Sequence, residues 1–250
     1  MSETNKLTTE MMEYLGCPCR YVDVGESEQE LVMEIYEEAA KRGVKEGFVP
    51  MLVGVDDTLW ECLQWNADEA GNGTTYSKEN VEAYRKKMLS APVEDGKKVL
   101  DRMTEEMKEW MEEFGDEEFE DDLAEEGEMI EEGSANTAFL GFEYSSGIIL
   151  AEIPVKNPWE VFAWLPFGGW NDCPDTPVLM AVSKYWYEQY GAVPASVTHD
   201  VLEYKVPKPV EGGVAMDLAM EQIAFCPEEE NPAALADSLT KSTVWFFWWD

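Results

Sequence analysis

The residues best suited to chemistry in this chain lie in one short run, FGGWNDCPDTP. After its two glycines come an aromatic, an amide, a carboxylate and a thiol side chain, namely Trp170, Asn171, Asp172 and Cys173. Glycines allow a ligand to approach the backbone, and loops between elements commonly carry sites. We therefore take these four residues as a candidate ligand or partner site. The simpler alternative is a tight turn in which Asn171 and Asp172 bond to the loop backbone.

A phosphate site is a second interpretation of the same run, because a helix is expected to begin at Thr176 and a helix N-terminus attracts anions. Asp172 and Asp175 already place negative charge at that end. The two carboxylates therefore disfavour a bound anion.

His199 is the only histidine, and Asp200 follows it directly. As a general base His199 would need a nucleophile, for which the candidates are the thiols of Cys173 and Cys226. Adjacent side chains on a strand point apart, so Asp200 is expected to orient the imidazole poorly. The same thiols and His199 would make only an incomplete zinc site without local ligand spacing. We expect neither a triad nor a metal site, and predict buried packing thiols instead.

Carboxylates inside or beside apolar segments form a third group, namely Asp200, Glu203, Glu221 and Asp250. Burial would raise the pKa of such a group and could suit it to acid–base chemistry or to a hard cation, although each could equally face water. A hydrolase or small-molecule-binding enzyme with a cleft near Asn171–Cys173 is therefore the alternative function. No cofactor is predicted, because the sequence contains no P-loop, no dinucleotide-binding glycine motif and no HExxH.

The elements that must position these residues follow from hydrophobic spacing and capping signals. Helices are predicted at about 28–42, after a cap at Asp56 or Asp57, after Ser77, and at 97–114, 176–190, 214–225 and 233–239. Strands are predicted at 48–55, 137–144, 147–155, 159–167, 201–207 and 244–249. Five aromatic residues in a row, 245–249, place large rings on both faces of the last strand. We therefore predict a central or doubly covered strand, the alternative being an exposed aromatic tail that docks into a partner.

The expected fold class is α+β, with a mixed, mainly antiparallel twisted sheet, helices packed on it, and the C-terminal aromatic strand buried. Residues 1–155 are predicted to form an acidic helix/strand portion, and residues 156–250, which hold seven of the ten tryptophans, a Trp-rich α+β domain. The charged insert 101–133 carries 17 acids against two bases and lacks EF-hand spacing. A solvated helix and linker is the favoured interpretation of that insert.

Composition limits the partners. The formal net charge is -35, which opposes binding to nucleic acid or anionic lipid and leaves basic proteins as candidate partners. No apolar run is long enough to span a membrane, and no secretory signal is visible. Five cysteines are an odd number, which does not indicate a disulfide framework. We expect a cytoplasmic protein; its oligomeric state is not predicted.

The C-terminal portion resembles a known family through several motifs. These are WEVFAWLPFGGWNDCP (159–174), YWYEQYGA (185–192), HDVLEYKVPKP (199–209), AFCP (224–227) and the terminal VWFFWWD. Over about 110 residues they are similar, in order, to a bacterial family of uncharacterised proteins with the domain of unknown function 4253. The resemblance implies no activity and no catalytic residues.

The leading functional hypothesis is a non-catalytic cytoplasmic binding protein. One version is an acidic immunity-type protein that neutralises a basic toxin or nuclease by charge complementarity. In that version segment 101–133 steers the partner, and Trp110 and Trp170 anchor it.

Overall fold

The computed structural model describes residues 6–23, 29–68, 77–114, 133–142, 147–227 and 231–249. Asp250, most of the acidic insert (115–132) and the side chain of Trp110 lie outside the described part, and so do the predictions made for them.

A single six-stranded sheet organises the chain, in the order β1-β3-β2-β4-β5-β6. The strands are β1 (Cys19–Val22), β2 (Val49–Gly54), β3 (Ile148–Ile153), β4 (Val193–Val197), β5 (Val201–Lys205) and β6 (Val244–Trp248). All neighbours are antiparallel except β2 and β4, which run parallel with Leu52 opposite Ser196. The predicted α+β class with a mixed, mainly antiparallel sheet is confirmed. Strands from both predicted portions share this sheet, and the boundary at 155/156 stays a prediction.

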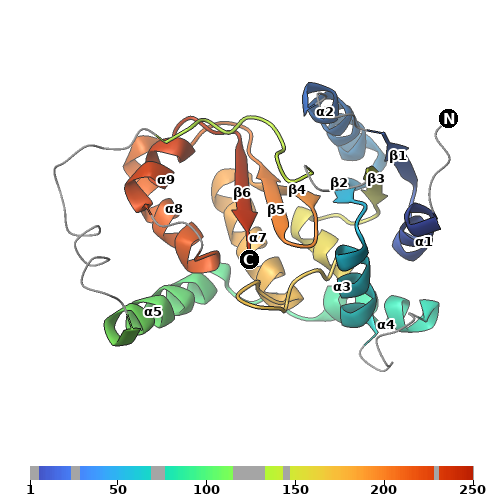
Figure 1. Ribbon diagram of the computed structural model, residues 1–250, viewed down its shortest axis with the longest axis horizontal. Helices are drawn as coiled ribbons and strands as arrows, with labels where there is room; N and C mark the ends of the chain where they lie inside the picture. The colour runs from blue at the N-terminus through green and yellow to red at the C-terminus, as the bar shows by residue number, and fades with distance from the viewer. Residues whose placement is uncertain are drawn as a thin grey trace.

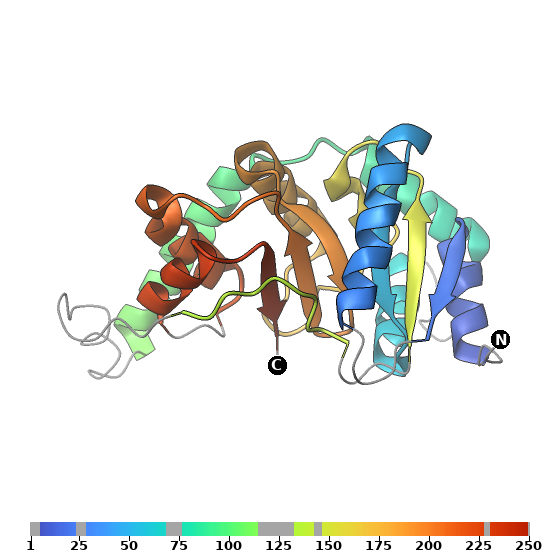
Figure 2. The ribbon, with the colours of Figure 1, turned by 90° about the horizontal axis from the view of Figure 1, so that it is seen from above.

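Helices cover the two faces of the sheet unequally (Figures 1 and 2). Among the described residues, one face carries α2 (Gln29–Glu46) and the irregular segment 133–142, which crosses the sheet on the same side (Figure 2). The other face holds the main core. Its residues come from α1 (Lys6–Leu15), α3 (Asp57–Ala67), α4 (Lys78–Ser90), α5 (Gly96–Phe114), the 3-10 helix η1 (Pro158–Ala163), α7 (Thr176–Tyr190), α8 (Gly212–Phe225) and α9 (Pro232–Leu239).

Local signals explain where the key helices begin and end. The Asp56 carboxylate accepts a hydrogen bond of 2.7 Å from the Leu59 amide at the start of α3. Asp175 caps α7 in the same way through the Val178 amide at 3.1 Å, and Gly191, with φ of 71°, ends that helix. Both carboxylates satisfy amides that have no partner within the helix.

The C-terminal aromatic strand is buried, but it lies at the edge of the sheet, so the predicted central position is wrong. Trp245, Phe247 and Trp249 face the main core and are at most 3% exposed. The Phe247 ring stacks on Trp186 with centroids 5.4 Å apart. On the opposite face Trp248 is 40% exposed. The helices that bury this aromatic face pack on one side of the sheet. The rings are therefore covered although β6 pairs with a strand, β5, along only one of its backbone edges.

Two predicted strands are wrong in the described residues. Within 159–167 the chain forms η1, where the Glu160 carboxylate accepts hydrogen bonds from the backbone and side-chain amides of Asn157 at 3.0 and 2.8 Å. Residues 137–142 form no strand and include a bend at Ala138 and a turn at Gly141–Phe142. The prediction also missed α1, β1 and β4. No helix in the described ranges is long and apolar enough to cross a membrane.

Candidate functional site

The loop that carries the first candidate residues is a compact turn. The Gly169 amide donates a hydrogen bond of 3.0 Å to the Cys173 carbonyl, and the Cys173 amide donates one of 3.0 Å to the Trp170 carbonyl. The Trp170 indole donates to the Phe167 carbonyl at 2.9 Å. Asn171, with φ of 44°, and Asp172 are exposed at the tip. The loop therefore follows the turn interpretation more closely than that of a cleft.

Cys173 is buried, and burial raises the pKa of its thiol above the ordinary range. A Cβ atom on the neighbouring Gly168 would lie 2.0 Å from the Pro174 carbonyl oxygen, which shows how closely this backbone packs. Cys226 is also buried and donates its thiol to the Trp248 carbonyl at 2.9 Å. Protonated thiols are poor nucleophiles, so neither residue is prepared for attack.

His199 and Asp200 lie in the turn between β4 and β5, and their side chains meet. The His199 Nε2 atom is 3.4 Å from an Asp200 carboxylate oxygen, and Nδ1 is 3.5 Å from Asp56 Oδ1. The expectation that the adjacent side chains point apart is wrong, because the residues occupy a turn and not a strand. Asp56 was predicted only as a possible helix cap and not as a site residue, although it follows the buried strand β2. Because β2 and β4 run parallel, Asp56 and His199, which follow these strands, lie at the same end of the sheet.

This corner of the molecule is rich in acceptors. Asp200 accepts hydrogen bonds from the Thr198 hydroxyl at 2.9 Å and from the exposed Trp248 indole at 3.0 Å. Burial raises the pKa of Asp56, and the Leu59 amide and His199 partly oppose that rise. Both ring nitrogens of His199 face carboxylates, so neither is directed at a nucleophile in the described residues. Nowhere in those residues do three or more His, Cys, Asp or Glu side chains form a group that could hold a metal ion.

Glu203 and Glu221 are buried elsewhere and serve the fold. Glu203 accepts hydrogen bonds from the Leu140 amide at 2.7 Å, the Gly141 amide at 3.5 Å and the Ser196 hydroxyl. Burial raises the pKa of Glu203 to about 7. The structure therefore does not bring Glu203 together with the Asn171–Cys173 loop.

In another part of the core, the Glu221 carboxylate connects three helices. It accepts hydrogen bonds from the Tyr185 hydroxyl at 3.1 Å and the Trp186 indole at 3.2 Å, and Lys97 Nζ lies 3.5 Å away. These partners come from α7 and α5, so this carboxylate ties α8 to both helices.

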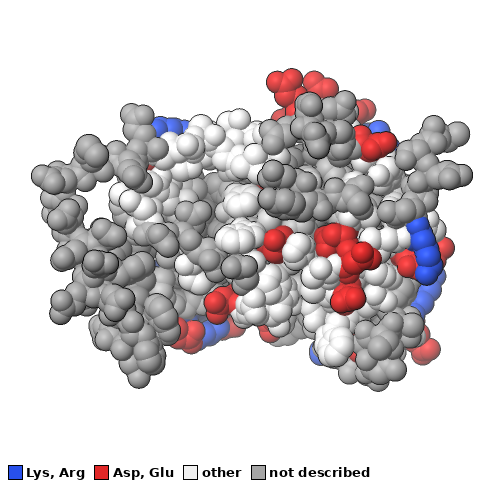
Figure 3. All heavy atoms as spheres, in the orientation of Figure 1, with Lys and Arg blue, Asp and Glu red and all other residues white. Residues whose placement is uncertain are grey.

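The exposed face of α3 adds residues that the sequence analysis did not single out. Asp57, Glu61 and Trp65 recur every fourth position and are exposed, opposite the buried Leu59 and Leu63. Trp65 is 66% exposed, which is the largest exposure of any described aromatic side chain. In Figure 3 acidic side chains gather over α3, and the basic ones lie toward the outline of this view.

We call these neighbouring groups the carboxyl-edge surface. It comprises the α3 residues Asp57, Glu61 and Trp65, the turn residues His199 and Asp200, and Trp248, the last residue of β6. Asp56 joins α3 to the turn through His199, and Asp200 joins the turn to Trp248. The Asn66 amide donates to the Pro166 and Gly168 carbonyls at 2.7 Å, which sets the Trp170–Cys173 loop beside the last turn of α3.

Comparison with known proteins finds a matching family model whose description names no activity. No curated protein and no solved structure matches the chain. The family match begins at β3, so the helices and strands before it, including Asp56 and α3, lie outside it. The family model described as Domain of unknown function (DUF4253) matches residues 149–250, which confirms the resemblance seen in the C-terminal part of the sequence.

Proposed function

We propose that the chain is a non-catalytic binding protein whose carboxyl-edge surface engages a positively charged protein. The observation that carries this proposal is two exposed indoles beside carboxylates: Trp65, 66% exposed, shares a face of α3 with Asp57 and Glu61, and Trp248, 40% exposed, donates to Asp200 at 3.0 Å. Exposed tryptophans are frequent anchors of protein interfaces, and surrounding carboxylates select a basic partner.

The charge of the whole chain supports the same partner class. At a net charge of -35, long-range attraction would speed the approach of a basic protein and slow that of a nucleic acid. In the immunity-type version of this proposal the acidic segment 101–133 adds to the attraction, and Trp170 extends the contact beyond α3. A cytoplasmic location is part of the proposal, supported by the five cysteines, none of which forms a disulfide in the structure.

The alternative hydrolase near Asn171–Cys173 has weaker support. A thiol mechanism would need Cys173 as thiolate, whereas its burial favours the thiol. A carboxylate mechanism would need a second acid facing Asp172 across a cleft, and the exposed tip of a closed turn offers no such enclosure.

The test is a binding experiment on the purified chain. Proteins from an extract of its native host are captured at low ionic strength, and each captured protein is purified and titrated by calorimetry. We expect a basic partner whose affinity falls as salt rises. Trp65→Ala should weaken that affinity by at least about thirtyfold, since an anchor residue contributes about 2 kcal/mol or more.

Val44→Ala is the matched control, because Val44 is an exposed apolar residue, 89% accessible, on α2 and outside the carboxyl-edge surface. This variant should bind as the wild type does. Equal affinities for the wild type, Trp65→Ala and a triple Asp57→Asn, Glu61→Gln, Asp200→Asn variant would refute the proposed surface.

A further inference from the structure

A cavity lies at the opposite end of the sheet from the carboxyl-edge surface. Its volume is about 710 Å³, and its walls include the first residues of β2 and β4 and the last residue of β5. The other walls come from α2 and the two residues that follow it, from residues 155–158 and 206–207, and from the end of α7. Cavities of about 300–1,000 Å³ are typical of small-molecule sites.

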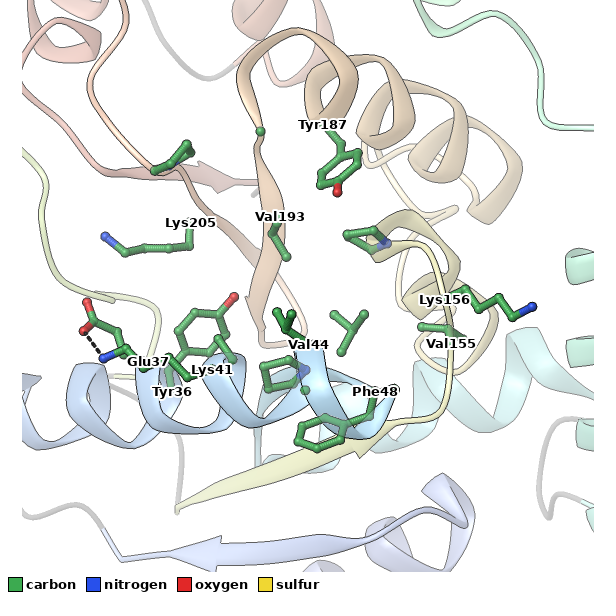
Figure 4. Close-up of a pocket in the computed structure, with 18 of the residues that line it drawn as sticks. Tyr36, Glu37, Lys41, Val44, Phe48, Val155, Lys156, Tyr187, Val193 and Lys205 are labelled. Atoms are coloured by element: carbon green, nitrogen blue, oxygen red, sulfur yellow. Dashed lines mark ion pairs between the residues drawn. The ribbon is translucent and has the colours of Figure 1, made fainter.

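The interior of this cavity is apolar and partly aromatic (Figure 4). Tyr36 and Phe48 approach from the α2 side, and Val193 lies on the floor at the start of β4. The Tyr187 hydroxyl points toward the cavity from α7 (Figure 4). Tyr187 is 40% exposed, which leaves an aromatic ring accessible to a ligand. A flat apolar molecule would contact rings on opposite walls.

The charged residues that line the cavity are mainly basic, whereas those of the whole chain are mainly acidic. The sequence has 53 acids and 18 Lys and Arg, whereas the lining holds three lysines, Lys41, Lys156 and Lys205, and one acid, Glu37. Lys41 and Lys205 extend on one side of the cavity and Lys156 on the other (Figure 4). Local positive charge on a strongly negative protein indicates a site for an anion.

Lys205 is the lysine best placed to bind a ligand. It is partly buried at the end of β5, and burial lowers the pKa of its ammonium group, an effect that the charge of Glu37 partly opposes. No described carboxylate lies within ion-pair distance of Lys205, whereas Lys41 faces Glu37 at 3.8 Å. A partly desolvated ammonium that forms no ion pair gains more from a ligand anion than a fully solvated one does.

We propose that this cavity binds a small organic anion with a flat apolar body. The acid group lies between Lys205 and Lys41, and the apolar body lies against Tyr36, Phe48 and Val193. This ligand site is separate from the proposed protein-binding surface, so either can be correct without the other.

The test compares two fluorescent probes with nearly the same aromatic body. One is 1-anilinonaphthalene-8-sulfonate, an anion, and the other is N-phenyl-1-naphthylamine, which is neutral. Each is titrated into the folded wild-type chain at physiological salt. We expect one sulfonate per chain, bound at least about fivefold more tightly than the neutral amine, because a charged hydrogen bond adds to the shared apolar contact.

Variants locate the site. Lys205→Met should weaken the sulfonate about tenfold and leave the neutral probe within about twofold, and Lys41→Met should act in the same direction. Lys98→Met is the control, because Lys98 is an exposed lysine on α5 that lies 3.6 Å from Asp95 and outside the cavity. Thermal melts confirm that each variant is folded. Equal binding of the two probes, or equal sulfonate affinities for the folded Lys205→Met, Lys41→Met and Lys98→Met variants, would overturn the proposal.

Discussion

The buried carboxyl group of Glu203 predicts a specific pH dependence of stability. Its side chain is 0% exposed beneath segment 133–142, and burial raises its pKa to about 7 from an ordinary value of 4.5. Three donors, the Leu140 and Gly141 amides and the Ser196 hydroxyl, partly offset the cost of burial. Glu203→Gln replaces the acid with a neutral group of nearly the same shape.

The sign follows from the proton count. Between pH 4.5 and 7 the folded chain holds the Glu203 proton more tightly than the unfolded chain does. The stabilising contribution is complete below pH 4.5, and it is lost as the pH rises to about 7. The whole effect corresponds to about 3 kcal/mol. Because the sequence pI is about 4.1, measurements begin at pH 5.5, where about 2 kcal/mol of the change is still to come.

Urea unfolding of the wild type and of Glu203→Gln, followed at intervals from pH 5.5 to 8, measures this effect. The other carboxylates are common to both proteins, so their contributions cancel in the difference. The free energy of unfolding of the wild type should fall by about 2 kcal/mol relative to the variant across this range. A difference that stays constant with pH would show that Glu203 is ionised throughout, and would refute the reasoning.

The two faces of β6 and the buried thiol supply the remaining predictions. Phe247 is 3% exposed and packs on Trp186, so Phe247→Ala should lower the free energy of unfolding by about 3–5 kcal/mol in urea. Trp248→Ala, on the 40% exposed face, should cost less than about half as much; equal losses would contradict the assigned faces. Cys173 should react with iodoacetamide much more slowly in the folded chain than in urea, as a peptide map of the labelled sites would show. Fast labelling of Cys173 in the folded chain would contradict its burial.

The elements with strong local signals were predictable from the sequence. Pro177 and Gly191 indicate the start and the end of α7, and the aromatic run 245–249 indicates a buried strand. The edge position of β6 was not predictable, because burial of side chains does not reveal which backbone edge is paired. The η1 segment illustrates the ambiguity of short apolar runs, since Pro158 at its first position was the stronger signal. β4 was missed because AVPASV contains proline and small residues.

The candidate site was predictable only in pieces. Asp200 was named from its sequence neighbour His199, but its contact with that residue depends on the turn, and the contact of His199 with Asp56 depends on the parallel pairing of β2 and β4. The exposed stripe of α3 had a local signal, because Asp57, Glu61 and Trp65 share a helix face opposite Leu59. The lysines of the cavity had none, since they come from separate elements.

The most direct test of the account is hydroxyl-radical footprinting of the chain, free and saturated with the basic partner identified by titration. Trp248 and Tyr187 are both 40% exposed, but they lie on the carboxyl-edge surface and at the opposite cavity respectively. We predict that the partner slows oxidation of Trp65 and Trp248 and leaves that of Tyr187 unchanged. Unchanged oxidation of both tryptophans in the saturated complex would contradict the proposed binding surface.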